Sequence, residues 1–318
     1  MGAPKRVLVT GASGFIGRAL CKRLVDQGFS VRAVIRPGGD EPVQGVSYVA
    51  LDLETTTDVQ DLVRDVCYVV HLAGRAHGKG GKAEQTLQSF VKSNVDPTRA
   101  LAEAAATAKA CRFVLLSSIG VHGDKSEGQP LREDSELKPH ANYAESKVLA
   151  EQVLQDALAD QETSYAIIRP TLVYGVNAPG NFARLIKACR SPVMLPLGMA
   201  TNRRSFVSVN SLIDLIVLCM EQKAAKNQVY VAADKYPVST KDLIVSIRSG
   251  MNKRPGVFPF PRTLARSTFL LLGKRPIYQQ LFGDLVVDAG KAVRELGWQN
   301  VANTLDEVKR LGREEVSL

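Results

Sequence analysis

The sequence predicts an α/β protein with a doubly wound parallel sheet, and observations near its N-terminus carry that prediction. The apolar run Val7–Val9 is long enough for one buried strand, and apolar residues then recur with helical spacing from Ile16 to Val25, ahead of Gly28. A second apolar run, Val31–Ile35, follows. Strand, helix and strand within about thirty residues make a βαβ unit, from which parallel sheets are built.

Three glycines, Gly11, Gly14 and Gly17, lie in the turn between the first strand and the helix. In such a turn the first glycine permits the tight bend, the second lets backbone N–H groups approach a pyrophosphate, and the third lets helix and strand pack closely. The helix N-terminus adds partial positive charge. The segment therefore predicts a dinucleotide site, and the alternative is a plain strand–turn–helix. Further contacts of this turn with the cofactor are expected from Ser13, Phe15 and Ile16.

Composition limits the classes of partner. The 318 residues suit one large α/β domain or a domain with a smaller lobe. Lys and Arg (41) exceed Asp and Glu (32), which favours an anionic ligand. No basic stripe with interleaved aromatic residues is present, so a phosphorylated small molecule is expected rather than nucleic acid. The five scattered cysteines lack a C-x-x-C pair and indicate a reduced, cytoplasmic protein.

Leader, membrane and metal signals are weak. Lys5 and Arg6 lead straight into a strand, so no signal peptide is expected. The apolar stretch Leu264–Leu272 is too short to span a bilayer. We expect it to form a helix packed on the domain, with contact to a membrane surface or membrane partner as the alternative. His71 and His77 have no cluster of cysteines or carboxylates around them, so no metal site is expected.

The end of the second strand predicts the type of dinucleotide. A carboxylate there would bind the adenosine ribose and favour NAD, whereas an arginine would pair with a 2′-phosphate and favour NADP. Arg36 follows Ile35 without a carboxylate, so NADP is expected, with NAD possible and a solvated loop cation as the alternative role of Arg36. A third strand, Val46–Ala50, ends near Asp52 and Leu53, where adenine contacts are expected.

A short helix is predicted over Asp58–Asp65, followed by a fourth strand over Cys67–Leu72. Cofactor contacts are expected at the end of that strand, from Leu72, Ala73 and Gly74. The region Ala83–Lys109 is predicted as one long helical region that Asn94 and Pro97 bend or interrupt.

The fifth strand, Phe113–Leu116, carries Ser117 and Ser118 at its C-terminal end, where open parallel sheets bind ligands. Tyr143 and Lys147 then lie one turn apart on one face of a helix that continues over Val148–Leu158. A nearby ammonium lowers the pKa of a tyrosine, which can then exchange a proton with a hydroxyl or ketone near neutral pH. Ser118 is expected to hold that oxygen.

The later part of the chain is less regular. The strand Ala166–Ile168 is expected to be broken by Arg169-Pro170. We predict a Rossmann-type dinucleotide-binding domain over residues 1–170, with returning strands near 206–209 and 229–232, and a mainly substrate-binding lobe over 171–318. Helices are expected to end at Arg190, to run over Ser211–Met220, to begin at Ser239 and end before Gly250, and to run over Leu305–Leu311.

Six motifs together resemble the extended short-chain dehydrogenase/reductases of the NAD-dependent epimerase/dehydratase family. They are TGASGFIG (Thr10–Gly17), HLAG (His71–Gly74), Asn94 with Thr98, SSIGVHG (Ser117–Gly123), YAESK (Tyr143–Lys147) and RPTLVYG (Arg169–Gly175). The resemblance implies that Ser118, Tyr143 and Lys147 are catalytic, that Asn94, Tyr143, Lys147 and Pro170 contact the cofactor, and that Ser117, Ser118, Asn181, Arg204 and Asp284 contact a UDP-sugar. It also implies a homodimer paired through the helices at Ala83–Lys109 and Tyr143–Leu158.

Two positions depart from the family pattern. His122 stands where members often have tyrosine, a change from which we derive little consequence. Leu281 stands where UDP-galactose 4-epimerases carry a diphosphate-binding arginine, and Lys274 or Arg275 are candidates to substitute for it.

Within the family, residues 195–209 and 286–298 are most similar to UDP-N-acetylquinovosamine dehydrogenases of bacterial polysaccharide pathways. This resemblance implies NADPH-dependent reduction of a UDP-4-keto-6-deoxy-N-acetylhexosamine. The first alternative is a UDP-hexose or UDP-N-acetylhexosamine 4-epimerase with tightly bound NAD. A 4,6-dehydratase is disfavoured because Ile119 and Gly120, rather than acidic residues, follow Ser118. A non-catalytic dinucleotide sensor is the remaining alternative.

Overall fold

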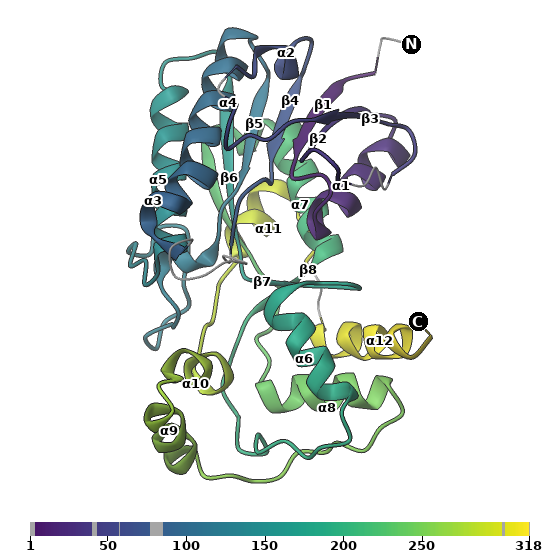
Figure 1. Cartoon of the computed structure of the whole chain (residues 1–318), viewed down its shortest axis with the longest axis vertical. Coiled ribbons are helices and arrows are strands. Elements are labelled where there is room, and N and C mark those ends of the chain that lie inside the picture. Colours follow the sequence, from purple (N-terminus) through teal and green to yellow (C-terminus); the bar gives the residue numbers. More distant parts are fainter. Residues whose placement is uncertain (1–3, 40–42, 57, 77–84, 301–302, 318) are drawn as a thin grey trace.

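A computed structural model describes residues 4–39, 43–56, 58–76, 85–300 and 303–317. Its main sheet has seven parallel strands in the order β3-β2-β1-β4-β5-β6-β9 (Figure 1). These strands are β1 Arg6–Thr10, β2 Ser30–Ile35, β3 Val46–Ala50, β4 Tyr68–His71, β5 Arg112–Leu116, β6 Ser164–Pro170 and β9 Gln228–Ala232. The predicted fold class is confirmed. The strand order reverses between β1 and β4, and ligands of such sheets bind at the carboxyl ends of the strands beside that reversal.

Helices cover both faces of the sheet. They and the helices of the smaller lobe are α1 Phe15–Asp26, α2 Gln60–Val63, α3 Leu87–Phe90, α4 Asp96–Thr107, α5 Asn142–Ala157, α6 Gly180–Arg190, α7 Val209–Glu221, α8 Thr240–Gly250, α9 Arg262–Leu271, α10 Arg275–Phe282, α11 Gly290–Leu296 and α12 Thr304–Ser317. Alternate residues of β1 point to opposite faces: Val7 and Val9 pack with α1 and α7, and Leu8 packs with α2, α4 and α5.

The structure describes the predicted helical region Ala83–Lys109 from residue 85 onward and divides it into α3 and α4. A π-helical turn, Val91–Val95, separates α3 from α4 and contains Asn94. Pro97 lies in the first turn of α4, but Val95 and Asp96 before it are already helical, so its missing N–H removes one hydrogen bond of the continuing helix. The π turn and Pro97 therefore lie together at the irregular part of the helix.

Two expectations about strands need correction. Arg169 and Pro170 do not break the sixth strand, because both pair with β9 and Arg169 has an ionic partner in the interior. The predicted strand at 206–209 is β8, Phe206–Ser208, but it pairs with β7, Leu172–Tyr174, in a separate two-stranded sheet. Of these two predicted strands, β9 alone joins the main sheet in the described structure, and β8 ends after three residues, where the Ser208 side chain caps α7.

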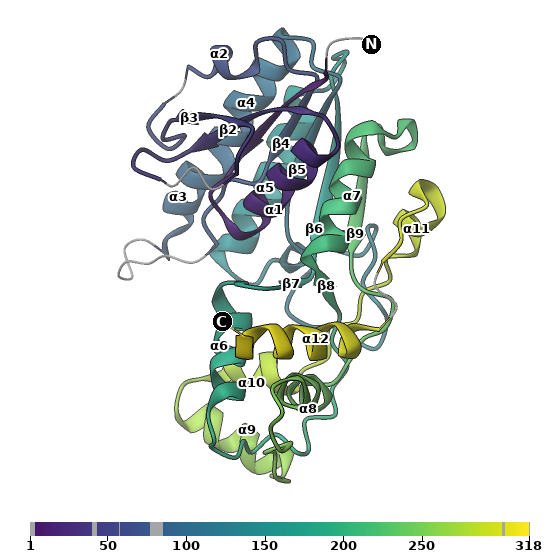
Figure 2. The same cartoon turned by 90° about the vertical axis from the view of Figure 1, so that its right-hand side faces the viewer.

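The smaller lobe has its own hydrophobic core. It is built from α6, α8 and α12 around residues such as Phe182, Ile247 and Val308. Figures 1 and 2 show α9 toward the end of this lobe that is remote from the seven-stranded sheet, with α10 beside it on the side nearer the sheet. Among the helices of the described segments, none is long and apolar enough to span a bilayer.

Candidate active site

The glycine turn is packed too tightly for side chains. A Cβ atom on Gly17 would lie 2.2 Å from the Gly11 carbonyl oxygen, and one on Gly11 would lie 2.8 Å from the Ala73 nitrogen. Gly11 also has a φ of +67°, which favours glycine. Gly14 is the N-cap of α1, so the helix N–H groups face this cradle. The turn therefore fits a dinucleotide pyrophosphate, with Ser13, Phe15 and Ile16 at the helix start.

The segment after β4 is held against this turn. The Thr10 hydroxyl lies 2.7 Å from His71 Nδ1 and accepts a 3.2 Å hydrogen bond from the Ala73 N–H. Burial and the charge of Lys147 lower the pKa of His71 to about 3, so His71 is neutral. Leu72, Ala73 and Gly74, predicted as cofactor contacts, therefore lie beside the glycine turn. The tether through Thr10 and His71 was not anticipated from the sequence.

Asn94 joins this segment to the helix that carries Tyr143. Its side chain accepts from the Arg75 N–H (2.7 Å) and donates to the Arg75 carbonyl (3.2 Å) and the Ser146 hydroxyl (2.9 Å). Ser146 in turn donates to the Tyr143 carbonyl at 2.8 Å. Asn94 thus positions the reactive helix, and its direct contact with a cofactor stays a prediction.

The three predicted catalytic side chains come together. Ser118 lies within hydrogen-bonding reach of the Tyr143 side chain, and its hydroxyl accepts from the Gly120 N–H at 3.1 Å. The Tyr143 ring packs edge-on against Phe90, with 6.1 Å between ring centroids. Lys147 lies buried one helical turn further along α5, and its Nζ would be 3.6 Å from a Cβ on Gly74.

Burial sets the protonation of these groups. It raises the pKa of Tyr143 to about 12, against the opposing hydrogen bond from Ser118. This differs from the lowered pKa expected from the nearby ammonium, because burial is the largest cause of the shift and the charge of Lys147 is not among its causes. Burial lowers the pKa of Lys147 to about 8, opposed by the charge of Glu151. At neutral pH Tyr143 therefore holds its proton while Lys147 remains mostly charged.

A buried ionic network that sequence reasoning missed lies behind these residues. Arg169 donates from Nε and Nη2 to the Glu151 carboxylate at 3.0 and 2.6 Å. The Ser117 hydroxyl also donates to Glu151, so Ser117, predicted as a substrate contact, points into the interior. The available signal was the position of Glu151 one turn after Lys147 on the same helix face.

His122 belongs to the same network, so its departure from the family pattern does have a structural consequence. Its Nε2 accepts from Arg169 Nη1 at 3.0 Å, so its Nδ1 carries the hydrogen and donates to the Glu136 carbonyl at 3.2 Å. Burial, with the charge of Arg169, lowers the pKa of His122. A neutral histidine therefore serves as a further hydrogen-bond acceptor for the Arg169 side chain.

The adenosine end of the predicted cofactor site is more open. Arg36 is exposed directly after β2, and Pro37-Gly38-Gly39 follow it. The Asp52 carboxylate accepts from the Glu54 N–H at 3.0 Å in a local turn, and Leu53 is half-buried beside it. Pro170 ends β6 next to β9. These positions are compatible with the predicted cofactor contacts, which stay predictions.

The predicted substrate residues fall into two groups. The Arg204 side chain donates to the carbonyls of Gln279 (3.3 Å) and Gly283 (3.1 Å), while Asp284 accepts from the Arg203 N–H at 2.7 Å. Arg204 and Asp284 thus share one corner of the smaller lobe. Asn181 lies apart from them in the first turn of α6, where Arg184 donates to it at 3.3 Å.

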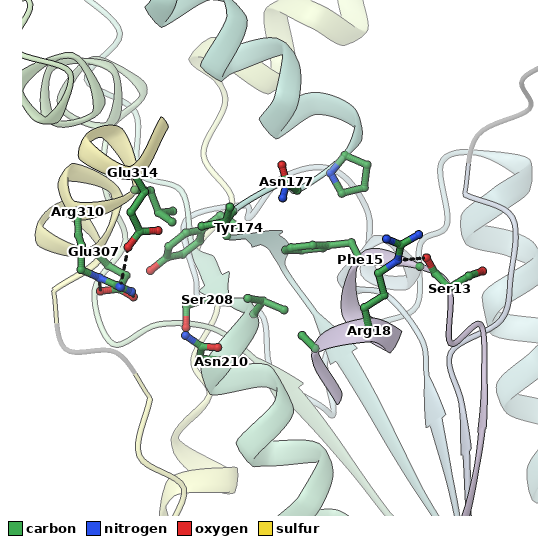
Figure 3. Close-up of a pocket in the computed structure, with 17 residues that line it drawn as sticks. Ser13, Phe15, Arg18, Tyr174, Asn177, Ser208, Asn210, Glu307, Arg310 and Glu314 are labelled. Atoms are coloured by element: carbon green, nitrogen blue, oxygen red, sulfur yellow. Dashed lines mark hydrogen bonds and ion pairs between the residues drawn. The ribbon is translucent and has the colours of Figure 1, made fainter. Parts of the chain in front are cut away.

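A cavity of about 650 Å³ lies between the glycine turn and the smaller lobe. Figure 3 shows Phe15 and Tyr174 pointing into it, with Arg18 on one side and α12 on the other. In α12, Arg310 pairs with Glu307 and Glu314. Ser118, Tyr143 and Lys147 are not among the lining residues, so this cavity adjoins the predicted phosphate loop rather than the reactive side chains.

Comparison with known proteins agrees with this architecture. The model of the NAD dependent epimerase/dehydratase family matches residues 7–233. The chain belongs to this family. It is 33% identical over 299 residues to the UDP-glucose 4-epimerase of Vibrio cholerae, covering 93% of this chain and 91% of that protein. It is 32% identical to dTDP-6-deoxy-L-talose 4-dehydrogenase (NAD(P)(+)) of Kitasatospora kifunensis, covering 70% and 72%.

Solved structures of similar fold include a UDP-glucuronic acid 4-epimerase from Bacillus cereus in complex with NAD. Its TM-score is 0.76 at 23% identity, with 98% of each chain covered. MoeE5 in complex with UDP-glucuronic acid and NAD has a TM-score of 0.78 at 24% identity, covering 98% of this chain and 100% of that one. The cradle around Gly11 and Gly17 in this chain fits such a dinucleotide. When bound, a nicotinamide dinucleotide supplies a carbon that gives or takes a hydride.

Proposed function

We propose that the protein reduces the C4 ketone of a UDP-4-keto-6-deoxy-N-acetylhexosamine, with Tyr143 as proton donor. The observation that carries the proposal is the protonated Tyr143, which lies within hydrogen-bonding reach of Ser118 and one helical turn from the Lys147 ammonium. The ketone becomes a secondary alcohol when its carbon accepts a hydride and its oxygen accepts the Tyr143 proton. Ser118 donates a hydrogen bond to that oxygen as charge develops on it.

The proposed cofactor is NADPH. The support is Arg36, exposed at the end of β2, where a guanidinium can pair with a 2′-phosphate and where no carboxylate follows directly. NADH is the second possibility. The named cofactor of the Kitasatospora relative, NAD(P)(+), is compatible with either.

The substrate site is proposed to hold the sugar diphosphate through Arg204. Its guanidinium is half-buried in the corner of the smaller lobe that also contains Asp284. Asn181 and Ser118 are proposed as further substrate contacts. The activity named for the Kitasatospora relative, a 4-dehydrogenase of a nucleotide-linked 6-deoxy sugar, supports C4 as the reacting carbon.

A 4-epimerase is the second candidate, favoured by the named activity of the Vibrio relative over 93% of the chain. The same three side chains would serve it: Tyr143 would take the C4 hydroxyl proton as C4 loses a hydride, and would return the proton to that oxygen as C4 receives a hydride on its opposite face, with a bound nicotinamide dinucleotide supplying the hydride chemistry. No net oxidation or reduction then occurs, so a tightly held NAD suffices.

One assay separates the two candidates. Purified protein is mixed with NADPH or NADH and the UDP-4-keto-6-deoxy-N-acetylhexosamine, and absorbance of the reduced cofactor is followed. We expect stoichiometric oxidation that is faster with NADPH, and an Arg36→Asp variant that reverses this preference. Conversion of UDP-N-acetylglucosamine or UDP-glucose to its C4 epimer without added cofactor, and no oxidation of NADPH, would replace the reductase with the epimerase.

The assembly and the cellular role are proposed from the resemblance to the epimerase/dehydratase family. A cytoplasmic homodimer that supplies sugars for bacterial polysaccharide is expected, with α4 and α5 pairing between the two copies. Light scattering on purified protein tests the dimer, and a monomer at micromolar concentration would exclude it.

A further inference from the structure

The helical hairpin α9–α10 leaves most of its apolar side chains uncovered. In α9 only Ala265 is buried, and in α10 only Phe282 is. Leu270, Leu271 and Leu272 are 48%, 89% and 60% exposed. Three consecutive exposed leucines are unfavourable in water and mark a surface that contacts something else.

The uncovered apolar residues are concentrated at this end of the molecule. It carries nine of the twelve exposed large hydrophobic side chains of the described residues, namely Val193, Met194, Met199, Phe258, Leu264, Leu270, Leu271, Leu272 and Ile277. Backbone hydrogen bonds join the segment that contains Val193, Met194 and Met199 to the segment that precedes α9. The Leu195 N–H donates to the Gly256 carbonyl at 2.8 Å, and the Gly198 N–H donates to the Phe258 carbonyl at 2.9 Å. Figures 1 and 2 both place α9 toward the far end of the smaller lobe, with α10 beside it on the side nearer the sheet. We call this set the apolar tip.

The chain segment that forms α9 and α10 carries charges of one sign. Residues 252–283 contain six Lys and Arg and no Asp or Glu, and residues 163–213 also contain no Asp or Glu. Arg266, Lys274 and Arg275 are exposed among the leucines. The whole chain carries a formal charge of +9. Leucines interspersed with cations match the two layers of an anionic membrane surface, in which acyl chains lie beneath negative headgroups.

We infer that the apolar tip is a membrane-docking surface, which binds anionic phospholipid headgroups through Arg266, Lys274 and Arg275 and inserts Leu270–Leu272 among the acyl chains. A second copy of this chain fits less well, because a symmetric contact would place these cations against the same cations without a carboxylate between them. The hairpin is short, so it lies in the interface and does not span the bilayer.

The hairpin is firmly joined to the lobe that it would dock. Phe269, Tyr278 and Phe282 form an aromatic stack inside it, with 6.2 and 5.1 Å between successive ring centroids. Arg262 donates to the Phe282 carbonyl at 2.7 Å, and Arg204 donates to Gln279 and Gly283. Docking therefore fixes the orientation of the substrate lobe on the membrane, with Arg204 directly behind the hairpin.

Vesicle flotation tests the inference. Full-length protein is mixed with vesicles of phosphatidylcholine alone or with about a third phosphatidylglycerol, at about 0.1 M and about 0.5 M NaCl. We expect flotation with the anionic vesicles at low salt, and at least about tenfold weaker binding to neutral vesicles or at high salt. Protein that stays with the soluble fraction under all these conditions overturns the inference.

Two variant sets separate the apolar and the charged contributions. The triple variant Leu270→Gln, Leu271→Gln, Leu272→Gln should bind about tenfold more weakly or worse, with unchanged melting temperature and unchanged turnover of soluble substrate. Its matched control is Leu137→Gln with Val293→Gln, two exposed apolar residues elsewhere, which should bind normally. The triple variant Arg266→Glu, Lys274→Glu, Arg275→Glu should lose binding, whereas Arg64→Glu, Lys109→Glu, Lys226→Glu should retain most of it.

Two results contradict a membrane partner. One is that the triple leucine variant floats with anionic vesicles to the same extent as the wild-type protein. The other is a wild-type dimer in lipid-free buffer that the leucine variant converts to monomers, which would assign the apolar tip to a second copy of the chain.

Discussion

Tyr143 and Lys147 lie on one face of α5, and burial moves their pKa values apart, to about 12 for Tyr143 and about 8 for Lys147. Tyr143 therefore holds its proton at neutral pH, as the proposed proton donor must. The charge on Lys147 is maintained by Glu151, whose own carboxylate is held by Arg169 and Ser117. Reactive groups and the buried ion pair behind them thus form one unit.

The variant Tyr143→Phe tests the proton donor. Removing one hydroxyl keeps the ring contact with Phe90 but removes the proton, so turnover should fall by about 10²- to 10⁴-fold while dinucleotide affinity stays similar. Steady-state kinetics and cofactor titration measure the two quantities. Full turnover by this variant would exclude Tyr143 as the acid.

The variant Glu151→Gln tests the buried carboxylate. Because the negative charge of Glu151 raises the pKa of Lys147, its removal should shift the alkaline limb of the pH–activity profile below its position near pH 8. It also leaves Arg169 buried without a counter-charge, at a stability cost of about 3–5 kcal/mol.

Two further variants distinguish the electrostatic role of Glu151 from a purely structural one. Glu151→Asp keeps the charge and should retain the alkaline limb near its original pH. Glu145→Gln changes an exposed carboxylate on the same helix and should leave the profile unchanged. Equal alkaline limbs in wild type and Glu151→Gln would refute the electrostatic role.

At the level of elements, the β1–α1 turn depends on close backbone contact. Gly17 is the tightest point, because a Cβ there would lie 2.2 Å from the Gly11 carbonyl oxygen and 2.7 Å from the Ala12 Cα. Helix α1 can begin directly on the turn, with its N–H groups facing the cradle, only when that position has no side chain.

The variant Gly17→Ala should therefore displace α1 and disrupt the cradle. We expect a loss of about 1–3 kcal/mol in unfolding free energy and a loss of dinucleotide binding. Gly28→Ala is the comparison: its Cβ meets nothing within 4 Å, and its φ of +82° adds only left-handed strain of about 1 kcal/mol. Urea denaturation and cofactor titration measure both. Equal cofactor affinities for the two variants would contradict the close-packing explanation.

Across the whole molecule, Asp234 joins segments that are distant in the sequence. It accepts from Tyr174 (2.7 Å) and Thr304 (2.8 Å) through one oxygen and from the Ser208 N–H (3.2 Å) through the other. β7, α12 and the start of α7 thus meet at one carboxylate that is 2% exposed. Burial raises the pKa of Asp234 from 3.8 to about 6.

This raised pKa predicts a pH-dependent stability. The folded protein binds the proton more tightly than the unfolded chain, so the contribution of Asp234 is fully present below about pH 4 and is lost as pH rises to about 6. The loss amounts to about 3 kcal/mol in unfolding free energy. The Asp234→Asn variant should lack this pH-dependent loss. The difference in unfolding free energy between wild type and variant, measured by urea denaturation, should therefore change between about pH 4 and about pH 6. A constant difference would contradict the prediction.

The sequence by itself determined the fold class and the glycine turn, and it selected Ser118, Tyr143 and Lys147, which the fold brings together. Each rests on short-range regularity: apolar periodicity in β1 and α1, glycine spacing from Gly11 to Gly17, and the helical spacing of Tyr143 and Lys147. Local patterns suffice there because steric limits and helix geometry act between near neighbours in the chain.

Only the tertiary structure decided which side chains surround those residues. The pairing of Glu151 with Arg169, the inward direction of Ser117 and the separate sheet of β8 depend on segments that meet across the fold. The raised pKa of Tyr143 and the uncovered leucines of α9 likewise follow from burial and exposure. Solvent accessibility depends on the packing of the whole chain, so no local pattern determines it.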